Sequence, residues 1–349
     1  MQLPASSVDE NCTSNRKTVK FSIALCTYNG ARYLPAQLDS IAAQTLLPDE
    51  LVICDDCSTD ETRAVIKSFA ARAPFAVRLY VNEVNLGSTK NFEQAISLCT
   101  GDIITLSDQD DVWLPAKLER IHAIFSTAPE VGMVFTDAEL VDENLSPWGA
   151  YLWQYTYTAR ERRLFHEGKA FDALLQRNVV TGATMAFRAL FRELVLPIPP
   201  NHFLIHDGWI ALMIAAVADI VALPEPLIKY RQHPQQQIGV VRRRNLHEAD
   251  AARKNSWAKR ESYYQSEIKK LDDIRARLIT DNNPNRIQVY STAPARITYL
   301  EELAAHYRVR GGIPKHRRRR VPVVLRELQT GRYSRFSKGL ASAVKDILR

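Results

Sequence analysis

Short apolar runs alternate with amphipathic segments over the first third of the chain. The apolar runs have the length and continuity of buried strands, and the segments between them carry apolar residues at helical spacing. The predicted strands cover residues 21–28, 50–56, 75–82 and 102–108, and the predicted helices cover residues 29–44, 58–71 and 88–99. A capping-box pattern, Ser58 followed by Glu61, marks the start of the second helix. Strands and helices in alternation predict an α/β fold with a parallel sheet.

The pattern becomes mixed beyond residue 130. We expect strands over residues 131–140 and 181–188, a helix over 209–217 and a strand over 218–233 that ends in a polar turn. The apolar segment 209–223 is shorter than the roughly 20 residues of a membrane span, and Asp219 interrupts it. We therefore interpret it as a core helix running into a strand. Charged stretches beyond residue 240 favour helices.

Composition narrows the class of protein. A chain of 349 residues with 46% apolar side chains is long enough to bury a full core, which excludes a disordered protein. The polar N-terminal segment, residues 1–20, predicts a flexible tail and contains no secretory signal pattern.

Five cysteines without framework spacing favour a reducing compartment, so we expect a cytoplasmic protein. Cys54 and Cys57 are spaced for a redox or zinc role, but with no second pair we favour Cys54 as the end of a buried strand.

Polar clusters follow three of the predicted strands, at residues 27–29, 55–56 and 108–111. Because ligands bind outside the carboxyl ends of parallel strands, these clusters should converge on one edge. Asp108, Asp110 and Asp111 repel one another unless a cation offsets them, which indicates either a metal site or a solvated loop. No GxGxxG or P-loop motif follows the first strand, which disfavours a dinucleotide oxidoreductase and a P-loop NTPase.

Five motifs in order resemble those of the family 2 glycosyltransferases of the GT-A fold. They are FSIALCTYNGARYLPAQLDSIAAQT, ELVICDDCSTDET, NLGSTKNFEQA, LSDQDDVWLPAKL and HDGW, spread over roughly residues 20–240. The resemblance is to the bacterial surface-polysaccharide branch, which includes many rhamnosyltransferases. It implies a Rossmann-like mixed sheet flanked by helices. The expected domains are a catalytic domain, residues 21–240, with a nucleotide-sugar half (21–112) and an acceptor half (113–240), and a helical basic extension, residues 241–349.

The resemblance implies transfer of a sugar, with inversion, from a dTDP- or UDP-sugar to a hydroxyl of a cell-surface glycan or a lipid-linked glycan. Rhamnose is the first sugar to consider. Asp108 and Asp110 correspond to the DxD motif, which holds Mg²⁺ or Mn²⁺ against the diphosphate. Asp110 is the expected direct ligand, and Asp108 is expected at the ribose or a metal-bound water. Asp111 either orients this pair or caps the helix that follows.

The remaining donor residues are also assigned by resemblance. Asp56 matches the position that accepts a hydrogen bond from the base, which suits uracil and thymine alike. The base and ribose positions correspond to Thr27, Tyr28 and Asn29, and the third motif supplies Asn85 and Lys90. Tyr28 as a core aromatic is the alternative. Asp60 is interpreted as a helix-terminus residue.

The acceptor hydroxyl needs a group that takes its proton. The resemblance assigns Asp207 as this base and His206 as its orienting residue, with an N-cap role for Asp207 as the alternative. Gly182 would let the backbone approach a ligand closely, and His233 is a candidate contact to the metal or the diphosphate. The QxxRW motif of processive synthases is absent, which favours the addition of one or a few sugars.

Two rival functions remain open at this stage. One is a carbohydrate- or nucleotide-binding module that kept the fold without turnover. The presence of all three acids argues against it: Asp108, Asp110 and Asp207. The other is a nucleotidyltransferase, which would usually carry a Gly-rich basic loop after the first strand; CTYNGARYL does not provide one.

The C-terminal segment, residues 308–349, is strongly basic. It holds thirteen Lys or Arg against two acids, so it carries +11 and the rest of the chain −4. One helical face of this segment collects apolar residues: Phe336, Leu340, Val344, Ile347 and Leu348. We favour an interfacial role at an anionic membrane surface, on the inner face of the plasma membrane, with packing on the catalytic domain as the close alternative. No reader motif accompanies the charge, so we expect no nucleic-acid partner.

Overall fold

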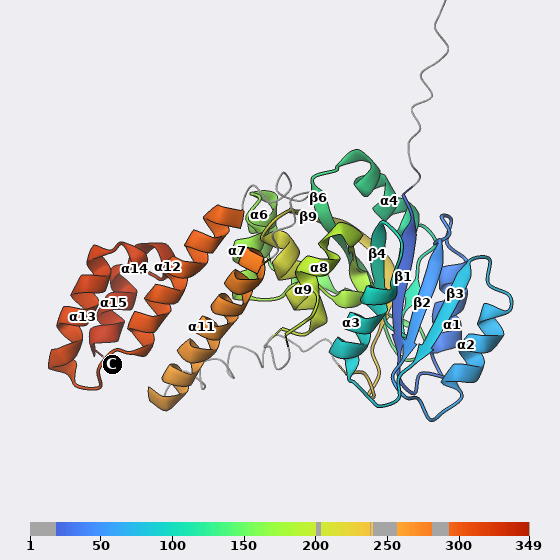
Figure 1. Ribbon diagram of the computed structural model, residues 1–349, viewed down its shortest axis with the longest axis horizontal. Coiled ribbons are helices and arrows are strands. Elements are labelled where there is room, and N and C mark those ends of the chain that lie inside the picture. The colour runs from blue at the N-terminus through green and yellow to red at the C-terminus, as the bar shows by residue number, and fades with distance from the viewer. Residues whose placement is uncertain (1–18, 200–203, 238, 240–256, 281–292, 349) are drawn as a thin grey trace, which may run out of the picture.

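The computed structural model describes residues 19–199, 204–237, 239, 257–280 and 293–348 (Figure 1). The predicted N-terminal tail up to residue 18 and the predicted helical stretch over residues 247–256 lie outside these ranges. Four parallel strands form one half of the sheet in the order β3-β2-β1-β4. They are β1 (Phe21–Thr27), β2 (Glu50–Asp55), β3 (Ala76–Val81) and β4 (Ile103–Ser107).

The second half of the sheet is mixed. It continues from β4 in the order β8-β6-β9-β5, with β7 paired to β6. Strand β8 is antiparallel to β4 and β6, whereas β9 is parallel to β6. The bounds are β5 (Val112–Trp113), β6 (Val131–Val141), β7 (Pro147–Tyr151), β8 (Met185–Arg188) and β9 (Asp219–Arg231). A mixed sheet between helices confirms the predicted fold class.

Helices cover both faces of the sheet and make two hydrophobic cores. Alternate residues of each strand point to opposite faces, so Ala24 and Cys26 join one core while Ile23 and Leu25 join the other. The first core includes α3 (Ser88–Leu98), α7 (Ala170–Gln176) and α9 (His206–Ala215), and the second includes α1 (Leu34–Ala42), α2 (Thr62–Ala70) and α4 (Lys117–Thr127). All ten residues of α9 are buried, as expected because the helix is apolar all round from Trp209 onward.

The remaining elements before the C-terminal extension are short. They are α5 (Trp153–Thr156), α6 (Ala159–His166), α8 (Arg192–Val195), η1 (Gly182–Thr184) and η2 (Ala189–Phe191). The predicted strand over residues 181–188 is therefore partly wrong, because its first half is a 3₁₀ turn.

The predicted capping box is also wrong. Helix α2 begins at Thr62 with Glu61 as its N-cap, and the Ser58 hydroxyl donates to Asp55 instead. Asp60 stands at the start of α2, as expected for a helix-terminus residue, and its Oδ1 accepts from the Thr62 backbone N–H at 3.0 Å.

In the described part of the chain, five helices follow the sheet and lie towards the end of the molecule opposite β3 (Figure 1). They are α11 (Trp257–Thr280), α12 (Ala293–Gly311), α13 (Arg317–Gln329), α14 (Arg332–Phe336) and α15 (Leu340–Leu348). Helices α11 and α12 join the first core through residues such as Ile274 and Leu300. Helices α13 to α15 enclose a small core of their own around Val324 and Tyr333. Among the described residues, no helix is both long and apolar enough to span a membrane.

Candidate functional site

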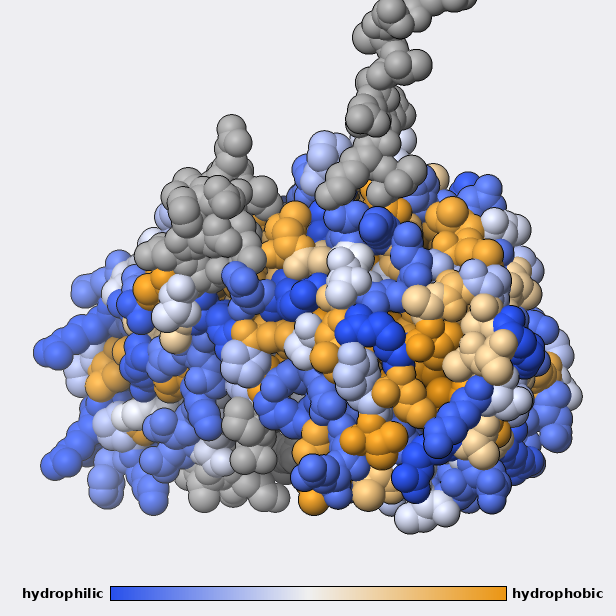
Figure 2. Space-filling model, turned by 45° about the vertical axis from the view of Figure 1, so that its right-hand side comes forward, coloured by the Kyte–Doolittle hydropathy of each residue, from blue (hydrophilic) through white to orange (hydrophobic). Residues whose placement is uncertain are grey.

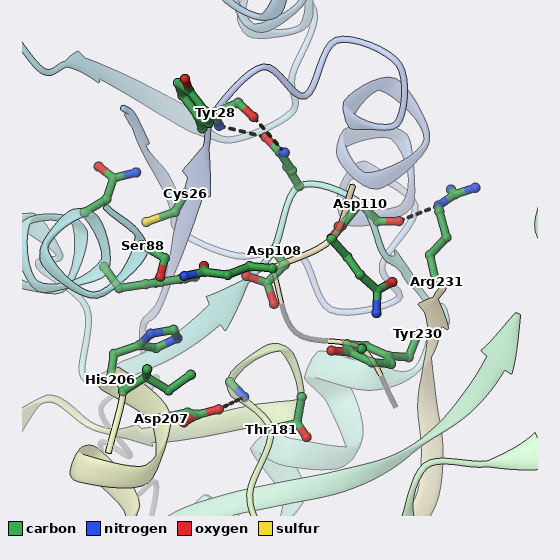
Figure 3. Close-up of a pocket in the computed structure, with 18 of the residues that line it drawn as sticks. Cys26, Tyr28, Ser88, Asp108, Asp110, Thr181, His206, Asp207, Tyr230 and Arg231 are labelled. Atoms are coloured by element: carbon green, nitrogen blue, oxygen red, sulfur yellow. Dashed lines mark hydrogen bonds between the residues drawn. The ribbon is translucent and has the colours of Figure 1, made fainter. Parts of the chain in front are cut away.

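A cavity of 930 Å³ opens where the carboxyl ends of β1, β2 and β4 meet the start of α9 and the end of β9 (Figure 3). Nine of the side chains predicted for the site line this cavity: Tyr28, Asn29, Asp56, Asn85, Asp108, Asp110, His206, Asp207 and His233. Thr27 and Lys90 do not. The Thr27 hydroxyl is buried and donates to Asp55 Oδ1 at 2.9 Å, and the Lys90 ammonium donates to Glu93 Oε2 at 2.7 Å.

Asp56 is held by three N–H donors. Its Oδ1 accepts from the Leu86 backbone N–H at 2.7 Å and from the Asn82 amide at 2.8 Å, and its Oδ2 accepts from the Gly87 N–H at 2.9 Å. Gly87 adopts φ +76°, a left-handed conformation that a side chain would disfavour. The loop after β3 therefore wraps around the Asp56 carboxylate and fixes its position at the cavity wall.

Gln109 joins the loop after β1 to the loop after β4. Its side-chain oxygen accepts from the Tyr28 N–H at 2.8 Å, and its amide nitrogen donates to the Tyr28 carbonyl at 3.0 Å (Figure 3). A Cβ on Gly30 would lie 2.1 Å from that oxygen, so a side chain there would displace the Gln109 amide from Tyr28. The Tyr28 side chain is 51% exposed, and the core alternative for it is wrong. Gln109 was not predicted from the sequence, because its only signal was its place inside the acidic motif.

The three acids after β4 have different surroundings. Burial, together with the charges of Asp110 and Asp207, raises the pKa of Asp108 to about 7. Asp110 Oδ2 lies 2.8 Å from His233 Nε2. Burial and the other two acids raise the pKa of Asp111 well above its usual range, and its Oδ1 accepts from the Arg231 backbone N–H at 3.0 Å. Helix α4 begins at Lys117 with Ala116 as its N-cap, so the alternative that Asp111 caps it is wrong.

Arg231, at the end of β9, holds this acidic loop from the other side. Its Nε donates to the Asp110 carbonyl at 2.6 Å, and its guanidinium lies 4.7 Å from the centre of the Tyr33 ring. No sequence signal indicated this contact, because it joins positions 121 residues apart.

Lys117 is fully buried beneath the acidic loop. Its ammonium donates to the Ala183 carbonyl at 2.7 Å and lies 3.8 Å from the centre of the Trp113 ring. Burial lowers the pKa of Lys117 to about 7, against the opposing effect of the Asp111 and Asp108 charges. Lys117 therefore connects the acidic loop with the η1 turn, and no sequence signal distinguished it from a solvated helical lysine.

Asp207 lies in the first turn of α9 and points into the cavity (Figure 3). Its Oδ1 accepts from the Asn178 amide at 3.0 Å, and its Oδ2 accepts from the Gly182 N–H at 3.2 Å. Burial raises the pKa of Asp207 to about 6, although these donors oppose the shift. The N-cap residue of α9 is Ile205, so Asp207 is not the cap.

His206 stacks on Phe92 with the ring centres 4.2 Å apart. Burial lowers the pKa of His206 to about 3, so its ring is neutral at ordinary pH. Its Nδ1 is buried without a hydrogen-bond partner in the described part of the chain. The structure thus places Asn178 and Gly182, and not His206, at hydrogen-bond distance from the Asp207 carboxylate.

The acidic loop fits a divalent cation. Two carboxylates at the cavity, Asp108 and Asp110, raise each other's energy when both are ionised, as the raised pKa of Asp108 indicates, and a cation between them would relieve this repulsion. Among the described residues, no three His, Cys, Asp or Glu side chains form a complete metal site by themselves. The donor set of hard carboxylate oxygens suits Mg²⁺ or Mn²⁺.

Comparison with known proteins gives consistent similarities. The family profile described as glycosyl transferase family 2 matches residues 22–195. An uncharacterized glycosyltransferase of Nostoc sp. is 32% identical over 219 residues, which cover 62% of this chain and 65% of the relative. An uncharacterized protein of Mycobacterium tuberculosis is 30% identical over 214 residues, covering 61% of this chain and 58% of the relative. The matches thus span about three fifths of these relatives.

Solved structures resemble most of the chain, as one example shows. The crystal structure of residues 1–349 of S. aureus TarS in complex with UDP-GlcNAc has a TM-score of 0.53 and 16% identity, and the match covers 94% of this chain and 89% of that one. This similarity establishes the fold.

Proposed function

The chain belongs to glycosyltransferase family 2, and from this premise we propose that it transfers a sugar from a nucleotide-diphosphate donor to an acceptor hydroxyl, with inversion at the anomeric carbon. One observation carries the proposal. The Asp207 carboxylate at the start of α9 and the acidic loop after β4 line the same cavity, close enough for the Asp207 charge to raise the pKa of Asp108. A base for the acceptor and an anionic site for the diphosphate's cation are thus brought together.

In this proposal the loops after β1, β2 and β3 bind the nucleotide. Asp56 accepts the N–H of a uracil or thymine base, and Tyr28, Asn29 and Asn85 line the base and ribose. UDP- and dTDP-sugars are therefore the donors to test, with rhamnose as the first sugar. Support for the nucleotide comes from the fixed position of the Asp56 carboxylate at the cavity wall. Thr27 and Lys90 have no direct role, because their side chains bind protein groups.

Asp110 and Asp108 would hold the divalent cation, whose charge would stabilise the departing nucleoside diphosphate. Other ligands would come from the diphosphate and water, as is usual for Mg²⁺. Arg231 holds the Asp110 backbone in place, and Lys117 supplies a positive charge behind Asp108. His233 contacts Asp110 directly, which supports a role next to the diphosphate.

Asp207 takes the acceptor proton. The acceptor oxygen forms a bond to the anomeric carbon, the bond from that carbon to the diphosphate oxygen breaks, and the acceptor proton moves to Asp207. A pKa of about 6 keeps Asp207 ionised at pH 7 and makes it a stronger base than an ordinary aspartate. Asn178 and Gly182 orient the carboxylate, and neutral His206 forms the wall beside it. A cell-surface glycan or lipid-linked glycan is the acceptor class that we propose.

The test is nucleotide release from a panel of UDP- and dTDP-sugars with Mn²⁺, Mg²⁺ or EDTA. We expect metal-dependent release with one donor, a loss of at least a hundredfold in Asp207→Asn, and retained donor binding in that variant. Asp219→Asn, an exposed acid at the start of β9, is the matched control and should keep full activity. Donor binding without release under any condition would favour a binding module, and no binding of any nucleotide sugar would refute the donor site.

A further inference from the structure

Helices α13 and α15 expose apolar side chains at regular spacing. Val321 and Leu325 of α13 are 38% and 50% exposed, and Leu340, Val344 and Leu348 of α15 are 71%, 51% and 57% exposed. Within each helix these residues are four positions apart, so they form one stripe along it. The apolar face predicted from the sequence is thus divided, because Phe336 and Ile347 pack on the cores and the other three remain exposed.

Both stripes face away from the rest of the protein. Glu327 of α13 and Asp346 of α15 are buried against α12, where they contact His306 at 2.8 Å and Arg310 at 2.7 Å. A helix turns about 100° per residue, so Leu325 and Val344 lie about 160° around their helices from these anchors. Because α13 and α15 pack against each other, the two stripes form one outer face. We call Val321, Leu325, Leu340, Val344 and Leu348 the outer apolar face.

Positive charge surrounds this face. The exposed basic residues on and next to the two helices are Lys315, Arg317, Arg318, Arg319, Arg326, Lys338 and Lys345. Within residues 313–348 the two acids, Glu327 and Asp346, are only 3% and 1% exposed, so neither offsets these charges at the surface. Figure 2 shows the same mixture at this end of the molecule, with hydrophobic side chains set among strongly hydrophilic ones.

We propose that the outer apolar face docks on an anionic lipid bilayer. A bilayer interface accepts apolar side chains and basic side chains on the same surface, since the former enter the acyl boundary and the latter reach anionic headgroups. A second copy of the chain is disfavoured, because pairing these faces would bring seven uncompensated positive charges on each copy against each other. The polar network around His306 and Arg310 holds both helices in place, so the face exists before docking. This inference does not rest on the proposed function.

Cosedimentation of the full chain with vesicles tests the proposal. The vesicles are phosphatidylcholine alone or with 30% phosphatidylserine. We expect the wild type to partition at least tenfold more strongly onto the anionic vesicles and to dissociate at high salt. Leu325→Gln/Val344→Gln/Leu348→Gln should lose at least fivefold of this binding. The matched control Leu47→Gln/Leu190→Gln, which changes exposed apolar residues elsewhere, should bind like wild type.

A second variant, Arg318→Gln/Arg319→Gln/Lys345→Gln, keeps the test decisive if the apolar variant misfolds, and it should also lose at least fivefold. Wild-type binding that ignores phosphatidylserine would overturn the proposal, as would binding as strong as wild type in both variants. Sedimentation velocity on the same samples tests whether two copies of the chain pair through this face. If wild type were a dimer and the apolar variant a monomer, the face would be assigned to self-association instead.

Discussion

Replacing Lys117 by methionine removes a buried ammonium group from beneath the acidic loop. Burial lowers the pKa of Lys117 from 10.5 to about 7 in the folded protein. Between these two values the unfolded chain binds a proton that the folded chain does not bind. The free energy of unfolding of the wild type therefore rises with pH through this window, by about 1.4 kcal/mol per pH unit from this group.

The effect is large enough to measure. The folded lysine is about half protonated at pH 7.0, so its contribution from pH 7.0 to 8.5 is about 2 kcal/mol. The ammonium also lowers the pKa of Asp108, so its removal raises that pKa further and makes the variant's stability fall with pH. Both effects have the same sign. The stability difference, wild type minus Lys117→Met, should increase by at least about 2 kcal/mol over this range.

The variant should fold at pH 7.0. Loss of the hydrogen bond to Ala183 leaves a buried carbonyl unpaired, at a cost of about 1–3 kcal/mol. Removal of the ammonium also removes its burial penalty, which is about 4 kcal/mol at this pH from the two pKa values. The removed penalty is at least as large as the cost, so the variant should remain folded and its stability can be followed against pH.

The assay is urea unfolding, followed by tryptophan fluorescence, at four pH values from 7.0 to 8.5 in EDTA. EDTA keeps divalent cations away from Asp108 and Asp110. Lys67→Met, which changes an exposed lysine of α2, is the matched control and should run parallel to wild type. If the free energies of unfolding of wild type and Lys117→Met changed with pH in parallel, a buried, titrating lysine at this position would be refuted.

Three further outcomes are expected. The pKa of about 6 for Asp207 predicts that kcat/KM falls about tenfold per pH unit below pH 6, because protonation removes the base; a flat profile down to pH 5 would contradict its role. Gly182→Ala would place a Cβ 3.0 Å from His206 Nε2 and 3.5 Å from Asp207 Cβ, so kcat should fall about tenfold or more while donor affinity, measured by calorimetry, stays unchanged. Although burial opposes it, hydrogen bonds from Ser22, Thr100 and Arg78 lower the pKa of Glu50 to about 2, so wild type should lose stability as pH falls from 4.5 towards 2. Thermal melts of Glu50→Gln should not show this loss of stability at low pH. An identical loss in both proteins would assign it to other carboxylates.

The local pattern of the chain was enough to predict much of the fold. The four parallel strands and the helices between them follow from apolar periodicity, which depends only on neighbours in sequence. The convergence of Asp56, Asp108 and Tyr28 on one cavity was also predictable, because carboxyl ends of parallel strands share an edge. The family followed from motif order, and the family profile over residues 22–195 confirms it.

Side-chain partners were decided by the tertiary structure alone. Asp111 was predicted either to orient its neighbours or to cap a helix. The cap is wrong, and the hydrogen bond that its carboxylate accepts from Arg231, 120 residues away, was not predicted. His206 was predicted to orient Asp207, but Asn178 and Gly182 hold its carboxylate, because the segment before β8 meets α9 only when the mixed half of the sheet forms. Such pairings depend on long-range packing, which no sequence period records.

The sequence by itself therefore determined the elements, the sheet edge that carries the chemistry and the family. Only the tertiary structure decided which polar groups are buried together. Lys117 shows the physical reason most clearly. Its position on a helix predicts a solvated side chain, yet it is buried against the Ala183 carbonyl of the η1 turn and the Trp113 ring, and this burial lowers its pKa. The same holds for α13 and α15, where contacts with α12 determine which apolar residues become core and which remain on the surface.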